Sequence, residues 1–554
     1  MTGFQGIRHF YWTNSPKCFD YLLVGADLLV EWLCYFLQLV FGSNVQCVPS
    51  ELVKVKRRHT AASEITSVNS LLLLFLFIHH RTFQSHIDHK KIKHIELAKT
   101  SHKSLADCKC RYHSLKLCFT QDSITYPIGR YIQTDTMADM KISNVEALDL
   151  SKSTQPINTG IGFFDHMLDQ LNSHAQIGVA VTVTTSGDLE DRNRHADESL
   201  QEKLMKQVGT ALGDEIKKII PTSATRSRFC CPLDEALVEC ILSSSPSDST
   251  GSISFDLAPY GIFPKTGRTK IGNMMTAPLE FFFQSLSVAS GLTISLQKVR
   301  GDNGHHVVES AFKAFSRALR NLIDGTDTDI AEGSSGNMER MWGSESQAAK
   351  EGLDLKRFGK SSRTTKETTI NVEMNLDGGA KGVKVEAGIK TLSSFYTHLA
   401  EESGLSLDVL CRGDTWVDDH HSSEDVSIAV GKVLDMALGT KAGLNRMWCA
   451  KAQEGDAVVE VTMDLSNRPC LTSNLSLSQC EYVGDMSTEM LEHVLDSLVM
   501  NGQMTVHIVE CNPGDIEDLA TATAKAFGRA LKLCAAVDPR RAGKTASSKG
   551  TLSV

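Results

Sequence analysis

The chain has 554 residues, too many for one ordinary hydrophobic core, so we expect two or three domains. Charged residues make up 22% and the net charge is -9, which argues against a general nucleic-acid-binding protein, because such proteins are basic. The 15 cysteines include no pair of CxxC motifs, and we interpret them as free thiols in a reducing compartment.

Residues 1–136 differ in composition from the rest of the chain. The apolar run Tyr21–Phe41 is long enough to span a bilayer, but Asp27 and Glu31 are costly at a membrane centre. A second run, Leu71–Ile78, is too short to span, and no signal-peptide pattern opens the chain. We interpret 1–136 as a presequence or a poorly ordered extension and expect no membrane partner. A presequence would direct the protein to a plastid; without one we expect the cytoplasm.

From Met137 onward, strand patterns alternate with helix patterns. The β-branched stretch 177–185 predicts a strand, and 200–212 has helical spacing. Further along, 458–464 and 504–509 read as strands on either side of an amphipathic helix at 486–500. This order predicts an α+β fold of layered units, with helices on one face of each sheet.

The chain also repeats itself from Met137 onward. Residues 159–166 are echoed by 391–398, and 313–319 by 525–531. Only two copies occur, so the pattern indicates tandem domains rather than a solenoid. We expect a first copy at 137–324, a polar linker at 325–362 and a second copy at 363–554.

Each copy contains one His-His-x-x-Glu box, at 305–309 and at 420–424. Residues four apart share a helix face, so the first His and the Glu of a box can bind one ion. The adjacent His points about 100° away and can reach a second ion. Imidazole and carboxylate suit Mn, Zn, Fe or Ni, and the absence of thiolate argues against a structural zinc. One such box could be a solvated surface pair, but two with the same spacing favour a metal site.

Several longer strings resemble imidazoleglycerol-phosphate dehydratase, an enzyme family of histidine biosynthesis. The matching strings are GFFDHMLDQL at 162–171, PLDEAL at 232–237, NGHHVVESAFK at 303–313, DDHHSSED at 418–425, DLSNRP at 464–469 and SSKG at 547–550. The resemblance implies two tandem copies of a two-layer α/β sandwich unit, each with an internal repeat of strands and helices. It also implies removal of water from imidazoleglycerol phosphate, giving imidazole acetol phosphate, at sites that hold two Mn ions between the subunits of a 24-subunit shell.

The resemblance assigns metal ligands to both copies, and each copy keeps only half of them. The expected ligands are His166, His305, His306 and Glu309 in the first copy, and His420, His421, Glu424 and His493 in the second.

The other half of each set has been replaced. In the first copy the early box reads Arg194, His195 and Glu198, and Phe281 replaces the lone His. In the second, Glu517, Asp518 and Thr521 replace the late box, while His398 matches His166 and Ser406 replaces His174. Because the losses are complementary, we expect one composite site built from both copies, with eight ligands for two Mn ions.

Further roles follow from the same resemblance. Glu367 is the expected acid/base, with Asp165 and His174 as further catalytic residues. Fixed cations and hydroxyls are expected to bind the substrate phosphate; they are Arg446, Arg468, Lys313, Ser547, Ser548 and Lys549.

The assembly expected from the resemblance is a homo-oligomer of 12 chains that supplies 24 copies. A non-catalytic, metal-binding scaffold or regulatory subunit of a dehydratase assembly is the alternative. An unrelated metallohydrolase is a weaker option, against which the Ser-Ser-Lys-Gly ending argues.

Overall fold

The computed structural model describes residues 139–146, 157–184, 198–244, 250–325, 357–378, 381–541 and 543–552. The extension at 1–136 and most of the expected linker lie outside these ranges. Both copies belong to one compact unit, Ile128–Val554. No helix of the described ranges is both long and apolar enough to cross a bilayer.

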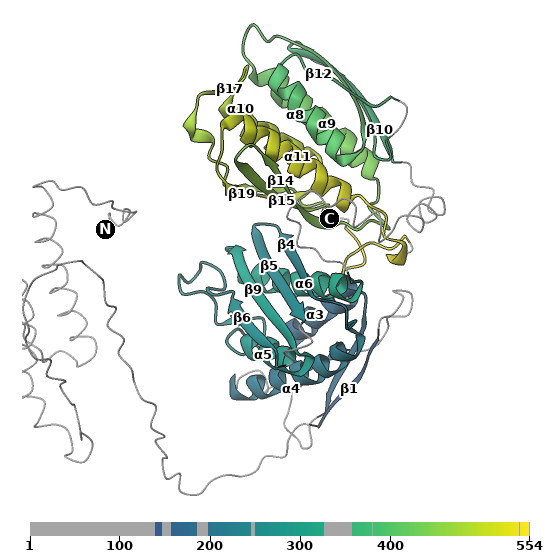
Figure 1. Cartoon of the computed structure of the whole chain (residues 1–554), viewed down its shortest axis with the longest axis vertical. Coiled ribbons are helices and arrows are strands. Elements are labelled where there is room, and N and C mark those ends of the chain that lie inside the picture. Colours follow the sequence, from purple (N-terminus) through teal and green to yellow (C-terminus); the bar gives the residue numbers. More distant parts are fainter. Residues whose placement is uncertain are drawn as a thin grey trace, which may run out of the picture. The chain divides into compact units, whose positions relative to one another are not determined.

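The first copy is built from two halves with the same order of elements (Figure 1). In each half two helices cover one face of a sheet, one before and one after its last strand along the chain. The first half contains β1 (Asp139–Glu146), β2 (Ile157–Asn158), α3 (Gly162–Gln170), the π-helical turn η3 (Leu171–Ala175), β3 (Gly178–Thr184) and α4 (Glu198–Ile219). The second contains β4 (Arg226–Leu233), β5 (Ala236–Ser244), β6 (Ser252–Asp256), β7 (Lys270–Ile271), β8 (Met274–Met275), α5 (Leu279–Ser290), β9 (Leu292–Arg300) and α6 (Gly304–Ile323).

The second copy repeats this order. Its first half contains β10 (Phe358–Thr364), β11 (Thr368–Asn375), β12 (Val383–Glu386), α8 (Lys390–Ser403), β13 (Ser406–Gly413) and α9 (His420–Leu438). Its second half contains β14 (Met447–Glu454), β15 (Ala457–Asp464), β16 (Cys470–Ser473), η4 (Leu477–Gln479), β17 (Tyr482–Val483), β18 (Met486–Ser487), α10 (Thr488–Asn501), β19 (Thr505–Asn512), α11 (Ile516–Cys534) and η5 (Pro539–Arg541). Because β10 pairs with β11, the second copy begins near Phe358, not at the predicted boundary of 363.

Three of the four main sheets share one four-stranded topology, and the first sheet has three strands of it among the described residues. Their strand orders are β1-β3-β2, β4-β5-β9-β6, β10-β11-β13-β12 and β14-β15-β19-β16. The last strand of each order is parallel to its neighbour, and the other pairs are antiparallel. Within a copy the two halves pack helix against helix, so the helices lie between two sheets, as Figure 1 shows for α8–α11. The predicted α+β sandwich with an internal repeat is confirmed.

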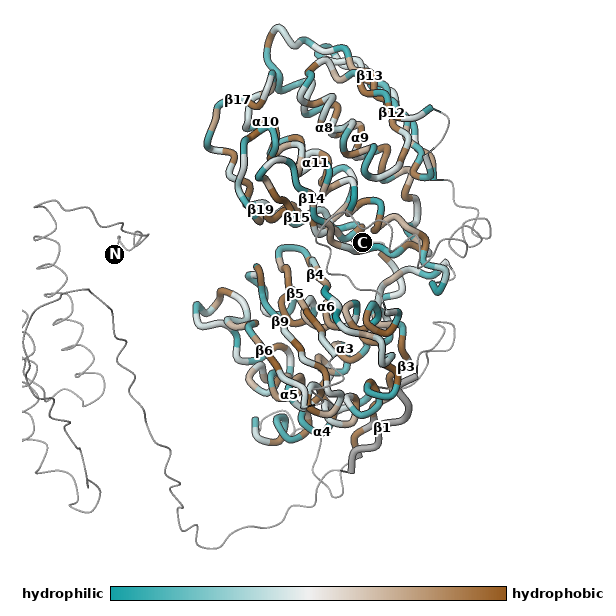
Figure 2. Tube along the Cα trace, viewed as in Figure 1, coloured by the Kyte–Doolittle hydropathy of each residue, from teal (hydrophilic) through white to brown (hydrophobic). Residues whose placement is uncertain are grey.

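Burial along the strands distinguishes outer sheets from shared ones. In β11, buried and exposed positions alternate, because one face covers helices and the other faces solvent. In β15 nearly every residue is buried. The second face of that sheet packs against β4 of the first copy, where Phe229 meets Trp448 edge to face at 5.5 Å. Figure 2 accordingly shows hydrophobic residues along β5, β14 and β15.

Candidate metal centre

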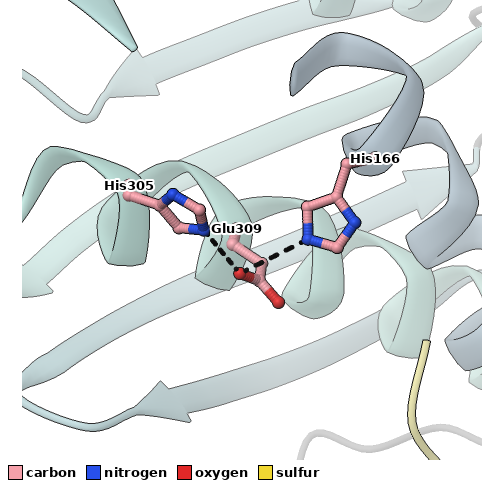
Figure 3. A group of neighbouring side chains, drawn as sticks. All are labelled: His166, His305 and Glu309. Carbon is pink, nitrogen blue, oxygen red and sulfur yellow. Dashed lines mark hydrogen bonds and ion pairs between the residues drawn. The ribbon is translucent and has the colours of Figure 1, made fainter. Parts of the chain in front are cut away.

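A trio of metal-ligand side chains converges in the first copy (Figure 3). Glu309 Oε2 lies 3.1 Å from His305 Nε2 and 3.8 Å from His166 Nε2. His305 and Glu309 stand four residues apart on α6, and His166 projects from α3. Asn303 caps α6 by accepting a hydrogen bond from the His305 backbone N–H at 2.9 Å. This cap begins the helix at the residue that places His305 over Glu309.

Buried charge holds the Glu309 carboxylate in place. Burial raises the pKa of Glu309. Hydrogen bonds from His166 and His305 and the ammonium of Lys313 lower that pKa by more than burial raises it, so the net pKa lies well below its usual range. Lys313 Nζ lies 2.8 Å from Glu309 Oε1, and its side chain is almost fully buried. The structure therefore pairs Lys313, expected to bind substrate, with a metal ligand.

His306 turns away from this trio. Its Nδ1 hydrogen-bonds Glu235 Oε2 at 2.7 Å, at the β4–β5 turn, and its Nε2 lies 3.8 Å from Asp234 Oδ2. Arg468 of the second copy donates to Asp234 at 2.8 Å. A carboxylate that fixes one ring nitrogen of a histidine and leaves the other free is the usual support for a metal ligand. The expected divergence of the two histidines within the box is confirmed.

The second copy contains an equivalent trio. Glu424 lies 3.4 Å from His493 Nε2 and 4.0 Å from His420 Nε2, and the two imidazole rings are 5.0 Å apart. His421 turns away toward Asp414, whose carboxylate lies 3.2 Å from His421 Nδ1. That hydrogen bond is the main cause that raises the pKa of His421.

The two trios fit a divalent cation and remain separate within one chain. In each, the ligand atoms lie within 4.8 Å of one another. Two imidazole nitrogens and a carboxylate suit Mn or a related metal and leave coordination positions open. Among the described residues, no hydrogen bond or ion pair joins the trio of the first copy to that of the second. The expected eight-ligand site is therefore not assembled by this arrangement of a single chain.

Glu367, the expected acid/base, lies with the second trio. It occupies the exposed turn between β10 and β11, close enough for its charge to act on His421. The carboxylate is accessible, as a group that exchanges protons with substrate must be.

The expected phosphate-binding residues divide into two groups. Arg446 is buried, donates to both carboxylate oxygens of Asp464, and also bonds the Ala546 carbonyl. This last bond holds the segment carrying Ser547, Ser548 and Lys549 beside it, with Lys549 exposed. Arg468 lies apart, on Asp234 of the first copy and within electrostatic reach of Glu309. Arg468 thus brings a cation of the second copy to the trio of the first.

Asp165 has a structural role, and the predicted equivalence of His166 with His398 is wrong. Asp165 accepts the backbone N–H of the residue six positions earlier at 2.7 Å, and Ser393 does the same at 3.1 Å. Burial is the main cause that raises the pKa of Asp165. Since Asp165 and Ser393 start equivalent helices, His166 corresponds to Ser394. His398 lies one helical turn further on.

His174 is buried away from solvent, and the residue predicted to match it is also wrong. Both ring nitrogens lack hydrogen-bond partners, and burial together with nearby cations, Arg317 first among them, holds the pKa of His174 well below 6.5. In the register of α3 and α8, Glu402 takes its place and pairs with Arg529, while Ser406 already belongs to β13. A catalytic role for His174 would require access that this position does not give.

Two glycines show which residues of α4 in the first copy are equivalent to which residues of α9 in the second copy. A Cβ on Gly213 would lie 2.6 Å from the Leu286 carbonyl oxygen, and one on Gly431 would lie 2.8 Å from that of Leu498. Leu286 and Leu498 occupy equivalent positions of α5 and α10. The glycines are therefore equivalent contact points, at which the paired helices approach too closely for a side chain.

This equivalence assigns different residues of the first copy to the positions of the second copy's His-His-x-x-Glu box. The positions of the second copy's His-His-x-x-Glu box hold Glu202, Lys203 and Lys206, and Phe281 stands where His493 does. Lys206 Nζ pairs with Glu202 at 2.6 Å and lies 4.4 Å from the centre of the Phe281 ring. The predicted box at 194–198 was therefore wrong by two helical turns. Its first residues lie outside the described ranges.

Sequence reasoning missed the carboxylates that support the second histidine of each box. Asp234 and Glu235 lie inside the PLDEAL string, and Asp414 follows β13 directly. Asp234 and Glu235 lie in the β4–β5 turn, far from the box in the sequence, and no pattern in the sequence pairs them with His306.

Comparison with known proteins identifies a family for this chain. The family described as imidazoleglycerol-phosphate dehydratase matches residues 159–319 and 387–531. The chain is 37% identical over 281 residues to imidazoleglycerol-phosphate dehydratase 2, chloroplastic, of Triticum aestivum, covering 50% of this chain and 99% of that relative. It is 36% identical over 200 residues to the imidazoleglycerol-phosphate dehydratase of Prochlorococcus marinus, covering 36% of this chain and 95% of the relative. A crystal structure of the Staphylococcus aureus enzyme is 29% identical, with a TM-score of 0.30, and covers 33% of this chain and 99% of that chain.

The family match and these relatives define the chain as a carbon–oxygen lyase that removes water. It belongs to the imidazoleglycerol-phosphate dehydratase family of histidine biosynthesis.

Proposed function

We propose that this chain dehydrates imidazoleglycerol phosphate to imidazole acetol phosphate at a composite site with two Mn ions. The trio of the first copy in one chain would face the trio of the second copy in another. The supporting observation is that each copy has a preorganised trio at one end and other side chains at the equivalent positions of its other end.

Each residue has a task that follows from its surroundings. The two trios would hold two divalent cations, which would supply Lewis-acid stabilisation of charge on the substrate imidazole and so favour loss of the substrate proton. Glu367 accepts that proton and delivers it to the departing hydroxyl. Arg468, Lys549 and the two serines bind the phosphate. Arg446, committed to Asp464, positions the C-terminal segment.

The assembly we propose is a homo-oligomer, with 12 chains supplying 24 copies. Trios that do not meet within one chain require a contact between chains. A metal shared by two chains would then be part of the interface, and its binding energy would stabilise the particle.

The test is to measure dehydration and particle mass of the full chain with a chelator and then with Mn. We expect chelation to abolish turnover and reduce the mass by sedimentation, and Mn to restore both. A monomer fully active with Mn would contradict the composite site. Inactive protein that changes the turnover of a complete single-copy dehydratase would instead favour a regulatory subunit.

For the location, we propose that residues 1–136 act as a plastid presequence. Relatives from Triticum aestivum, Pisum sativum and Arabidopsis thaliana are named chloroplastic, which supports this proposal. Import of a reporter fused to 1–136 into isolated chloroplasts would test it, and failure of import would favour the cytoplasm.

A further inference from the structure

The helix ends that lack a metal trio have opposite charge in the two copies. The basic face of the first copy is formed by Glu202, Lys203, Lys206 and Phe281. The acidic face of the second copy is formed by Ser394, Glu517, Asp518 and Thr521. Each face occupies the backbone positions that hold metal ligands in the other copy.

The basic face presents two ammonium groups, one of which also belongs to a local network. Lys206 pairs with Glu202 and lies over the ring of Phe281, but 44% of its side chain remains exposed. Lys203 is exposed, and within the described ranges it forms no ion pair. The face therefore presents a cation where the second copy presents His421.

The acidic face presents two carboxylates that form no ion pair with a described residue. Glu517 and Asp518 lie in the first turn of α11, where negative charge is favoured by the helix dipole. Glu517 is exposed and Asp518 is half-buried, and neither forms an ion pair with a described residue. Lys525, equivalent to Lys313, turns instead to Glu454 at 2.5 Å. The dipole accounts for the sign of these charges, but not for their presence at both histidine positions of the lost box.

We propose that these two faces bind each other between chains, with Lys203 and Lys206 paired to Glu517 and Asp518 in place of two metal ions. This inference rests on the proposed function, in which the trios meet between chains. That contact joins α3 and α6 of one copy to α9 and α10 of another, so it is head to tail. When it is repeated by copies of the same fold, it brings α8 and α11 of a second copy against α4 and α5 of a first.

The consequence is two classes of interface with different sensitivities. The contact between trios depends on metal and should tolerate salt. The contact between the basic and acidic faces is independent of metal, but it rests on exposed ion pairs, which salt screens. Chelator or high salt alone should therefore each yield intermediate species, and the two together the smallest one.

The experiment is sedimentation velocity of the full chain in chelator at low salt. A Lys203→Glu/Lys206→Glu variant should lose the intermediate species, and so should Glu517→Lys/Asp518→Lys. Combining all four changes should restore it, because the charges are then exchanged across the interface. Lys217→Glu/Lys218→Glu is the matched control, since it reverses two exposed charges in the last turn of α4; it should keep the intermediate.

The inference is overturned if chelated wild type at low salt is already the smallest species. It is also overturned if charge reversal has no effect or if the four-fold exchange fails to rescue association. Failure of the proposed function is distinguishable, because it would appear as wild-type protein whose mass and turnover do not respond to Mn.

Discussion

At the scale of single residues, the two copies place different chemistry on the same backbone. His493 contacts Glu424, whereas Phe281, at the equivalent position, lies beneath Lys206. The ligand types were predictable from the sequence, because a His and a Glu four apart on a helix share one face. The supporting carboxylates were not. Glu235 and His306 are 71 residues apart, and only the fold brings them to 2.7 Å.

A matched pair of substitutions tests the difference. Loss of a residue that supports a metal ligand usually costs up to about 100-fold. Because His493 is itself an expected ligand, we expect His493→Ala to lower turnover by more than about 100-fold. Phe281→Ala should leave turnover within a few-fold, since that face holds no metal. Steady-state rates at saturating Mn measure both, and equal losses would contradict the assignment of one active trio to each copy.

At the scale of elements, the errors of sequence reasoning were whole helical turns. His398 lies four residues beyond Ser394, and the box assigned to 194–198 lies eight residues before its true position at 202–206. A slip of four or eight residues returns nearly the same helix face, because the period is 3.6 residues. The apolar pattern therefore looks correct in either register. The close approaches at Gly213 and Gly431 distinguish the two registers.

Those glycines give a prediction about helix pairs. Gly431→Ala should force α9 from α10, lowering the free energy of unfolding by about 1–3 kcal/mol and weakening Mn binding by separating His493 from Glu424. Gly213→Ala should cost similar stability in α4 and α5 without affecting Mn affinity. Urea unfolding and Mn titration measure the two effects. Equal loss of affinity in both variants would contradict the link between α9–α10 spacing and the metal.

At the scale of the whole molecule, the C-terminal segment joins the copies. Asp538, 1% exposed, lies between Arg540 and Arg541 and accepts a hydrogen bond from Gln176 of the first copy at 2.8 Å. Burial raises the pKa of Asp538, but these partners lower it by more than burial raises it, so the net pKa lies below 3.8. A carboxylate whose pKa is lower in the folded state than in the unfolded state stabilises the protein when the pH is above its unfolded-state pKa. This stabilisation is lost as the pH falls through its folded-state pKa.

Asp538→Asn should therefore lower the free energy of unfolding by about 3–5 kcal/mol at pH 7, because it leaves the buried guanidinium of Arg541 without its carboxylate. The difference from wild type should shrink as the pH falls below about 4. Urea unfolding at several pH values measures it, with exposed Asp214→Asn as the control. A difference that stays constant down to pH 3 would exclude titration of Asp538 as its cause.

The duplicated unit should also be independent of the N-terminal extension. Every described element lies at or beyond Asp139, and the family match begins at residue 159. Deletion of 1–136 should thus leave the circular dichroism spectrum and turnover unchanged. Insoluble or inactive protein would show that the extension belongs to the fold.

The network of Glu202, Lys206 and Phe281 makes the loss of the first copy's second trio difficult to reverse in evolution. Recovery would need a histidine at 202, a glutamate at 206 and a histidine at 281. None of these changes alone makes a ligand set, and Lys206→Glu by itself would place a carboxylate beside Glu202 and against an aromatic ring. Because the gain comes only with the last substitution, each intermediate sequence would be selected against or drift. The network therefore makes a second trio in the first copy difficult to build by single substitutions.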